Sequence, residues 1–347
     1  MIEWVRRTGP VTLAAYMARA IQTYYASRDP LGAAGDFTTA PEIGQVFGEL
    51  LGLWCVAVWR DLGQPDPVAL VELGPGRGTL MADATRAIAR VAPAMTRALQ
   101  IHLVETSPTL REAQAERVAS ATWHDSIASL PSLPTLLLAN EFLDALPVHH
   151  LIRQHGGWHE RLVVVADGAL AWSMDPRPSP LTDAIDPALA SAPEDAVVEL
   201  CLAGAAVVRD IASHLVACRG AALFIDYGYA TPGIGETVQA VKAHRTHPVL
   251  ATPGDADLTA HVDFARMAAA GWGAGATVFG PVRQGPFLTS LGAEVRTQQL
   301  IAANPARARD LGDSLRRLID PAGMGSLFRV LGLAGSGDLL LPGFGEP

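Results

Sequence analysis

The feature of this sequence best suited to chemistry is a glycine-rich turn between an apolar run and a helical stretch. Residues 68–73 form a short, mostly apolar run, and residues 79–91 have the spacing of a helix. Gly74, Gly76 and Gly78 lie between them. Glycines at such a turn let backbone amides approach a ligand closely at the start of a helix. The turn therefore predicts a ligand site, and the alternative is a turn whose glycines serve packing alone.

The spacing of these glycines distinguishes two kinds of cofactor. A dinucleotide fingerprint, G-x-G-x-x-G, would place its third glycine where Thr79 stands, but Gly78 comes one residue earlier. The segment 72–78 has the form E-x-G-x-G-x-G, which resembles motif I of class I methyltransferases that use S-adenosylmethionine. The resemblance implies that Glu72 and the three glycines bind this cofactor. A dinucleotide oxidoreductase is accordingly disfavoured.

Two further acidic residues follow strand-like runs. Glu105 comes directly after residues 101–104, and its two carboxylate oxygens match the two hydroxyl groups of a ribose. Asp125 follows a shorter candidate strand that ends at His124. Resemblance to the same class of methyltransferase implies a ribose contact for Glu105 and a contact with the adenine amino group for Asp125. The alternatives are an exposed strand-end carboxylate for Glu105 and a surface loop for Asp125.

Polar residues also follow a third apolar run, at residues 136–139. They are Asn140, Glu141 and Asp144. Ligands of open α/β sheets bind beyond the carboxyl ends of the strands, so we predict catalytic roles for all three. The two carboxylates suit a cationic acceptor such as guanidinium, whose planar fork matches a carboxylate. The alternative is a helix N-terminus, with Asn140 as its cap and the two acids favoured by the helix dipole.

Five segments together resemble one family, and they span most of the chain in that family's order. The segments are GDFTTAPEIGQVFGELLGLW (35–54), VELGPGRGTLM (71–81), LLLANEFLDALPVHHL (136–151), FIDYGY (224–229) and DLTAHVDF (257–264). They resemble the MidA family of S-adenosylmethionine-dependent methyltransferases, which includes a mitochondrial arginine methyltransferase of complex I assembly. The resemblance implies methylation of arginine in a protein substrate, with a respiratory complex I subunit as a candidate.

Two other functions stay open at this point. One is methylation of a small molecule, and the other is an assembly protein that keeps the methyltransferase fold without catalysis. The sequence specifies neither the acceptor, nor mono- or dimethylation, nor the oligomeric state. Asp36 is interpreted either as part of a loop over the cofactor or as a cap of the following helix. Asp226 either faces the cleft or ends a strand, and for His261 a structural role is favoured over a site role.

The order of apolar and helical segments predicts the fold. Short apolar runs alternate with helices, which favours a mostly parallel sheet in an α/β protein. Together with the resemblance, this predicts a Rossmann-like class I methyltransferase domain at residues 67–347, after an N-terminal helical region at 1–66. The latter would contain helices over 10–26 and from Pro41 up to Gly63. Gly156-Gly157 and Asp167-Gly168 punctuate hairpins, so we expect an antiparallel insertion at about 147–200.

Composition excludes several classes of protein. The chain has 347 residues, of which 49% are hydrophobic, so it is not a disordered chain. Its net charge of −9 does not favour nucleic acid as a partner. The three cysteines show no paired spacing, and the histidines between 149 and 159 lack a metal-ligand pattern, so no metal site is expected. No secretory signal and no membrane-spanning run is evident, which predicts a cytoplasmic protein.

Overall fold

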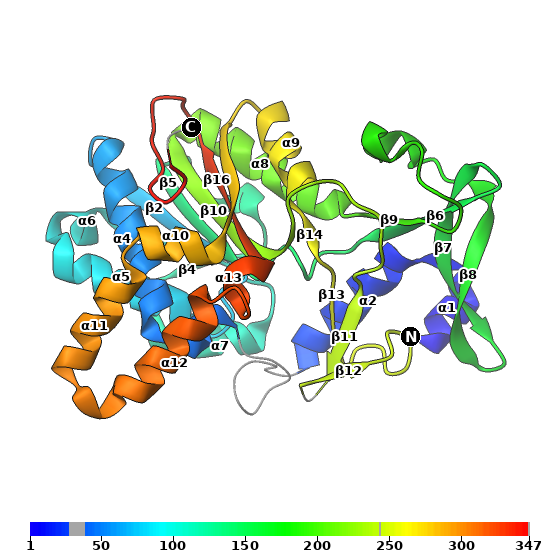
Figure 1. Cartoon of the computed structure of the whole chain (residues 1–347), viewed down its shortest axis with the longest axis horizontal. Coiled ribbons are helices and arrows are strands. Elements are labelled where there is room, and N and C mark those ends of the chain that lie inside the picture. The colour runs from blue at the N-terminus through cyan, green and yellow to red at the C-terminus, as the bar shows by residue number, and fades with distance from the viewer. Residues whose placement is uncertain (28–38, 243, 346–347) are drawn as a thin grey trace. The chain divides into compact units, whose positions relative to one another are not determined.

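The computed structural model describes residues 1–27, 39–242 and 244–345 (Figure 1). Contacts divide the chain into two compact units. Unit 1 contains Met1–Phe37, Asp144–Ala206 and Tyr229–Arg266, and unit 2 contains Thr38–Leu143, Val207–Gly228 and Met267–Pro347. The boundary near residue 66 that the sequence suggests stays a prediction. The two units are described separately below.

Unit 2 is built on a mostly parallel sheet, in the strand order β15-β16-β10-β5-β2-β3-β4 (Figure 1). The strands are β2 (Val68–Leu73), β3 (Leu99–Val104), β4 (Thr122–His124), β5 (Thr135–Asn140), β10 (Gly220–Tyr229), β15 (Thr277–Arg283) and β16 (Phe328–Ala334). The neighbours from β10 to β4 pair in parallel, and β16 is antiparallel to both β10 and β15. Every residue of β2 and β5 is buried, which explains their continuous apolar runs. The predicted α/β fold with a mostly parallel sheet is confirmed.

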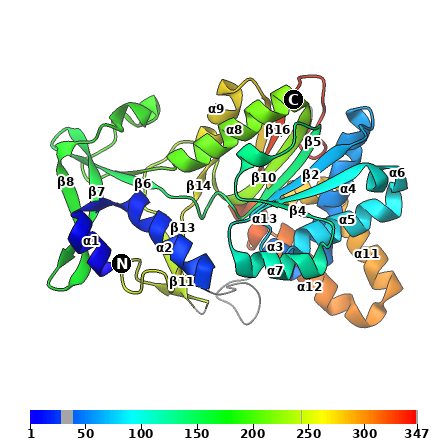
Figure 2. The same cartoon turned by 180° about the vertical axis from the view of Figure 1, so that it is seen from behind.

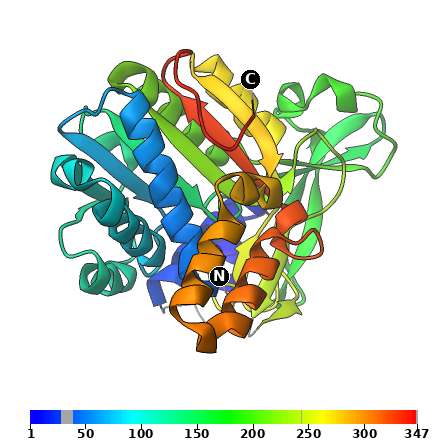
Figure 3. The same cartoon turned by 60° about the vertical axis from the view of Figure 1, so that its left-hand side comes forward.

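Helices connect and follow these strands. They are α3 (Ala40–Ile43), α4 (Gln45–Asp61), α5 (Thr79–Val91), α6 (Pro93–Ala98), α7 (Pro108–Arg117), α8 (Leu202–Cys218), α9 (Phe264–Gly273), α10 (Gln284–Ser290), α11 (Ala293–Ala303), α12 (Ala308–Ile319) and α13 (Met324–Leu327), with 3-10 turns η1 (Ile127–Ser129) and η4 (Pro305–Arg307). Helices α11 and α12 lie side by side, as Figures 1 and 3 show. In the view from behind, α7 lies near β4 (Figure 2). Apolar side chains of α4 share one core with those of β2, β5 and β10.

The helix predicted from Pro41 to Gly63 is interrupted. Gly44 has extended backbone angles, φ 173° and ψ 153°, and separates the short helix α3 from α4. The Ser314 hydroxyl of α12 donates a hydrogen bond of 3.0 Å to the Ile43 carbonyl, which leaves that carbonyl outside a continuous helix. The prediction of a single helix is therefore wrong at this point, because a tertiary contact supplies the backbone partner that the helix would have provided.

Unit 1 contains two antiparallel sheets and two N-terminal helices. The larger sheet has the order β1-β7-β6-β9, with β8 paired to β7, and the smaller one has the order β12-β11-β13. The elements are α1 (Ile2–Thr8), β1 (Val11–Thr12), α2 (Leu13–Ser27), β6 (His149–Gln154), β7 (Gly157–Ala166), β8 (Ala169–Pro178), η2 (Thr182–Ala184), η3 (Pro187–Leu189), β9 (Val197–Leu200), β11 (Gln239–Lys242), β12 (Arg245–His247), β13 (Asp257–Thr259) and β14 (Val262–Asp263). The expected antiparallel insertion is confirmed. Among the described residues, no helix has both the length and the apolar character needed to cross a bilayer.

Two glycines let α4 and α5 of unit 2 pack with their backbones close together. A Cβ atom added at Gly52 would lie 2.5 Å from the Ala84 carbonyl oxygen. At Gly48 it would lie 2.6 Å from the Cβ of Asp83. Since α5 begins at the glycine-rich turn, this close contact helps to hold the helix that carries the turn.

Replacing Gly52 by alanine is therefore expected to destabilise the protein. The added methyl group would meet backbone atoms that have little room to move, and overpacking of this kind costs about 1–3 kcal/mol. Gly312→Ala in α12 is the matched control, because its added Cβ would meet only the end of Arg316, at 3.9 Å. That control is expected to gain up to about 1 kcal/mol from helix propensity. Urea denaturation measures both, and equal stabilities of the two variants would contradict the prediction.

Candidate functional site

The register of three parallel strands brings the predicted site residues to one edge of the sheet in unit 2. Leu73 of β2 is level with Val104 of β3 and with Ala139 of β5. The residues that follow these three, at the same edge, are Gly74, Glu105 and Asn140. Three segments that are far apart in the sequence therefore leave the sheet side by side.

The glycine-rich turn has a backbone shape that explains its composition. Gly74, Gly76 and Gly78 have φ values of 58°, 52° and 79°, in the left-handed region where other residues are strained. Gly78 also precedes the first residue of α5, so the turn ends at a helix N-terminus. An added Cβ at Gly74 would lie 3.0 Å from the ring of Phe142, in the segment after β5. The turn thus combines a left-handed backbone at the start of a helix with close packing against the neighbouring strand end.

Glu72 lies beneath this turn, in the buried part of β2. Its side chain is only 3% exposed, and burial raises the pKa of its carboxyl to about 8. The backbone N–H of Met81 donates a hydrogen bond to this carboxyl and thereby links β2 to α5. Within the described part of the chain, its Oε2 has no hydrogen-bond partner. The structure therefore ties Glu72 to the frame of the turn.

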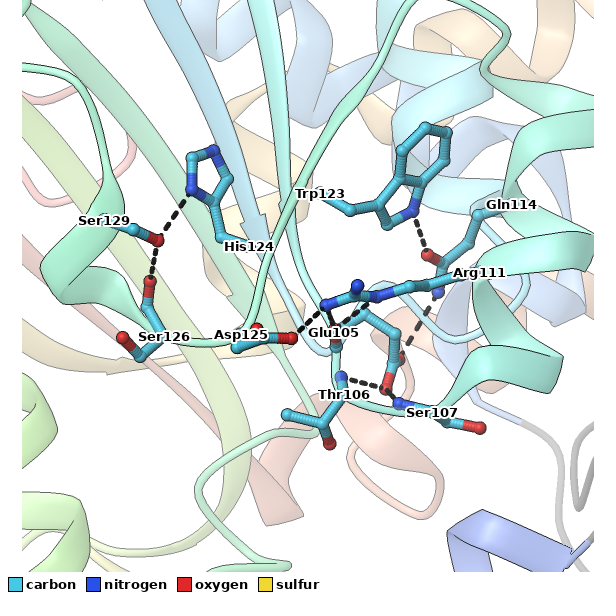
Figure 4. A network of polar contacts seen from close by, with 10 residues as sticks. All are labelled: Glu105, Thr106, Ser107, Arg111, Gln114, Trp123, His124, Asp125, Ser126 and Ser129. Carbon is cyan, nitrogen blue, oxygen red and sulfur yellow. Dashed lines mark hydrogen bonds and ion pairs between the residues drawn. The ribbon is translucent and has the colours of Figure 1, made fainter.

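Glu105 is held by hydrogen bonds immediately after β3 (Figure 4). Its Oε1 accepts from the backbone amides of Thr106 and Ser107, both at 2.8 Å. Its Oε2 accepts from Nε2 of Gln114 at 3.3 Å. Burial raises the pKa of this carboxyl, although these hydrogen bonds and the charge of Arg111 act in the opposite direction. The carboxylate therefore has a defined orientation at the edge of the sheet.

Asp125 is joined to the same network through Arg111 of α7 (Figure 4). The Arg111 Nε donates to the Glu105 carbonyl at 2.7 Å, and its Nη2 contacts Oδ1 of Asp125 at 2.6 Å. The Asp125 side chain is 88% exposed, so one of its oxygens remains open to solvent or ligand. The structure thus places Asp125 near Glu105, and its contact with adenine stays a prediction.

The loop after β5 carries the second set of predicted residues. Asn140 is the last residue of β5 and is buried, while Glu141 has a left-handed backbone with φ 49°. Oε1 of Glu141 accepts from the Ala40 amide at 2.9 Å and from Nδ2 of Asn140 at 3.3 Å. Oδ1 of Asn140 has no partner among the residues described. Bends and turns follow Glu141, so the alternative of a helix N-terminus is wrong.

Asp226 supports this loop from β10. Its carboxylate is buried, and its Oδ2 accepts from the Leu143 amide at 3.0 Å, while its Oδ1 accepts from the Tyr227 amide at 2.9 Å. The Glu141 amide also donates to the Ile225 carbonyl, at 2.9 Å. Both ends of the short segment 141–143 are therefore fastened to β10.

Two predicted residues do not belong to unit 2. Asp144 is buried but belongs to unit 1, where its carbonyl accepts from the Ala260 amide at 2.9 Å. Asp36 lies outside the described residues.

Among the residues that are described, no group of three or more potential ligands is placed to hold a metal ion. His150 contacts Glu199 at 2.8 Å, and His261 has a pKa lowered by burial.

Residues 50–282 match a family model described as "Putative S-adenosyl-L-methionine-dependent methyltransferase". Two similar proteins are named protein arginine methyltransferase NDUFAF7, mitochondrial. The one from Danio rerio is 36% identical and the alignment covers 93% of this chain and 83% of that protein. The one from Homo sapiens is 33% identical, with 95% and 81% covered. A crystal structure from Burkholderia thailandensis, bound to S-adenosyl-homocysteine, is 27% identical with a TM-score of 0.83, covering 96% of this chain and 90% of that one.

The fold and these similarities define an S-adenosylmethionine-dependent methyltransferase. The chain belongs to the family that includes the NDUFAF7 proteins, which confirms the resemblance to the MidA family. Its cofactor is S-adenosylmethionine. The described residues fit this cofactor, because the left-handed glycines form a turn that ends at the N-terminus of α5, and Glu105 offers acceptor oxygens of fixed direction at the same edge of the sheet. The individual contacts of the glycines, Glu72, Glu105 and Asp125 with the cofactor stay predictions.

Replacing Glu105 by glutamine is expected to weaken binding of S-adenosyl-homocysteine by about 10- to 100-fold. Hydrogen bonds to a charged group contribute about 1.5–3 kcal/mol, and the substitution removes the charge while keeping the shape. Isothermal titration calorimetry measures the affinity. Glu116→Gln, an exposed change on α7, is the control and is expected to bind like the wild type. A normally folded Glu105→Gln protein with unchanged affinity would contradict the ribose contact.

Proposed function

We propose that this chain is a protein arginine methyltransferase in which Asn140 and Glu141 hold the acceptor guanidinium. The observation that carries the proposal is a pair of polar side chains, the buried Asn140 and the half-buried Glu141, at the same strand-end level as the glycine-rich turn. Asn140 supplies an amide oxygen that accepts no hydrogen bond from any described residue, and Glu141 supplies a carboxylate. This combination suits a group that is cationic and rich in N–H donors.

The carboxylate of Glu141 suits such a group as a hydrogen-bond acceptor. Its Oε1 already accepts two hydrogen bonds, from Ala40 and Asn140. A carboxylate can accept two parallel N–H bonds from a guanidinium, which matches the planar fork of that group. The contact with Ala40 also fixes the direction of the carboxylate, which favours a planar, bidentate acceptor over a flexible ammonium group.

The chemistry divides between the cofactor and the chain. When bound, S-adenosylmethionine supplies an electrophilic methyl group on its sulfonium. The acceptor nitrogen would gain the methyl group and lose one proton to solvent, and S-adenosyl-homocysteine would be the other product. Glu141 would draw positive charge toward the nitrogens that it contacts, and Asn140 Oδ1 would accept an N–H from the attacking nitrogen. Because arginine is protonated at neutral pH, this orientation would favour the lone pair needed for attack.

The names of the relatives support arginine as the acceptor, since the similar proteins from Danio rerio and Homo sapiens are called protein arginine methyltransferases. By the resemblance to the MidA family, a respiratory complex I subunit is the candidate substrate. Asp144, the acid three residues after Glu141, stays a predicted catalytic residue from its place in the sequence. Labelled S-adenosylmethionine and extract from a strain lacking the gene would test the acceptor. Label in protein methylarginine is expected, and label only in small molecules would refute the proposal.

Replacing Glu141 by glutamine is expected to lower methyl transfer by about 100-fold, the size of effect seen when one preorganised polar group is removed from an active site. Binding of S-adenosyl-homocysteine is expected to stay unchanged, because Glu141 is assigned to the acceptor. Transfer of labelled methyl groups to the extract measures the first quantity, and calorimetry measures the second. Glu112→Gln on α7 is the exposed control. Activity near the wild-type level would remove Glu141 from the mechanism.

A further inference from the structure

Gln114 belongs to the network of hydrogen bonds around Glu105, which we call the cofactor network, and no motif in the sequence pointed to it. It lies on α7, its side chain is completely buried, and its amide group contacts three separate segments. Figure 4 shows two of these contacts, with Glu105 and with Trp123. Nε2 donates to the Gly76 carbonyl at 2.7 Å and to Oε2 of Glu105 at 3.3 Å. Oε1 accepts from the indole Nε1 of Trp123 at 2.8 Å. One side chain therefore joins the glycine-rich turn, the end of β3 and β4.

The partners determine how this amide is oriented and which residue type can provide it. The indole N–H of Trp123 only donates, so it requires an acceptor. The Gly76 carbonyl and the ionised carboxylate of Glu105 only accept, so both require donors. A primary amide offers two N–H donors and one carbonyl. A carboxylate lacks the donors and an ammonium group lacks the acceptor, so neither matches this set of partners.

We propose that Gln114 is a positioning residue that sets the glycine-rich turn and Glu105 in their binding geometry without touching the cofactor. The inference rests on the assignment of Glu105 and the glycines to the cofactor. A buried group with all partners satisfied resists movement, because any displacement leaves a donor or acceptor unpaired away from water. The site is then formed before the cofactor arrives, and the ordering cost of binding is smaller.

The test compares S-adenosyl-homocysteine binding by three variants. Gln114→Met keeps length and burial but removes the three hydrogen bonds, and a loss of affinity of about 10- to 100-fold is expected. Gln114→Glu keeps the shape of the side chain. Once the new carboxyl group ionises, however, it has no N–H or O–H to donate to the Gly76 carbonyl and the Glu105 carboxylate. Its affinity is therefore expected to fall relative to wild type as the pH rises from about 5.5 to about 8.5, since the protonated carboxyl retains one donor. A residue that only fills space would not produce this pH profile.

Gln284→Met is the matched control for loss of a buried glutamine. Gln284 is also completely buried in unit 2, and its Nε2 donates to the Leu318 carbonyl at 3.0 Å, outside the cofactor network. This variant is expected to lose stability while binding S-adenosyl-homocysteine like the wild type. Equal losses of affinity in Gln114→Met and Gln284→Met would overturn the proposal, because they would indicate a general effect of destabilisation.

Two further measurements keep the outcome decisive. Trp123→Phe removes a single N–H at a partly exposed position and is expected to weaken binding several-fold, even if the Gln114 variants fold poorly. Adding Gln114→Met to Glu105→Gln is expected to cost less affinity than adding it to the wild type, because the two side chains act together. Fully additive losses, or wild-type affinity of folded Gln114→Glu at every pH, would refute the positioning role. Binding of S-adenosyl-homocysteine is measured without a methyl acceptor. A finding that the acceptor is not arginine would therefore leave this test unchanged.

Discussion

The register between β2 and its two parallel neighbours is the constraint on which the candidate site depends. Leu73 pairs with Val104 on one side and with Ala139 on the other, so three chain segments leave the sheet at one level. The side-chain direction alternates along a strand, so a slip of one residue would turn every side chain of that strand to the opposite face of the sheet. The complete burial of β2 and β5 opposes such a slip, since polar strand ends would then enter the core.

A sheet edge of this kind has many backbone and side-chain polar groups close to an apolar core, and each needs a partner. Near β3, the amide of Gln114 and the guanidinium of Arg111 satisfy them. Near β5, the carboxylate of Asp226 and the backbone of α3 do so. These supporting residues come from α7, β10 and the start of α3, and of these only α7 lies outside the five segments that resemble the MidA family. The geometry of the site therefore depends on these supporting residues as well as on the glycine-rich turn.

The sequence predicted local features well where one segment determines its own conformation. The glycine-rich turn, the strand runs and the hairpin at Asp167-Gly168 all depend on neighbouring residues, and that hairpin has left-handed angles at both positions. The first hairpin turn lies at His155-Gly156 instead of Gly156-Gly157, because strand pairing sets its register. Tertiary contacts decided the other cases. Gln114 reaches a carbonyl 38 residues away, and no spacing within α7 predicts such a contact.

The conformation of Glu141 follows from the same reasoning. A left-handed backbone costs free energy for a residue with a side chain, about 1–2 kcal/mol, and it persists only where the surroundings hold it. Here the Glu141 amide donates to the Ile225 carbonyl. The amide of Leu143, two residues further along the chain, donates to the Asp226 carboxylate. Its carboxylate is bonded in turn to the first amide of α3. A regular helix at this point would satisfy the backbone but turn the carboxylate away from Ala40. The chain therefore keeps a strained residue whose side-chain direction is fixed, as positioning of an acceptor for methyl transfer would require.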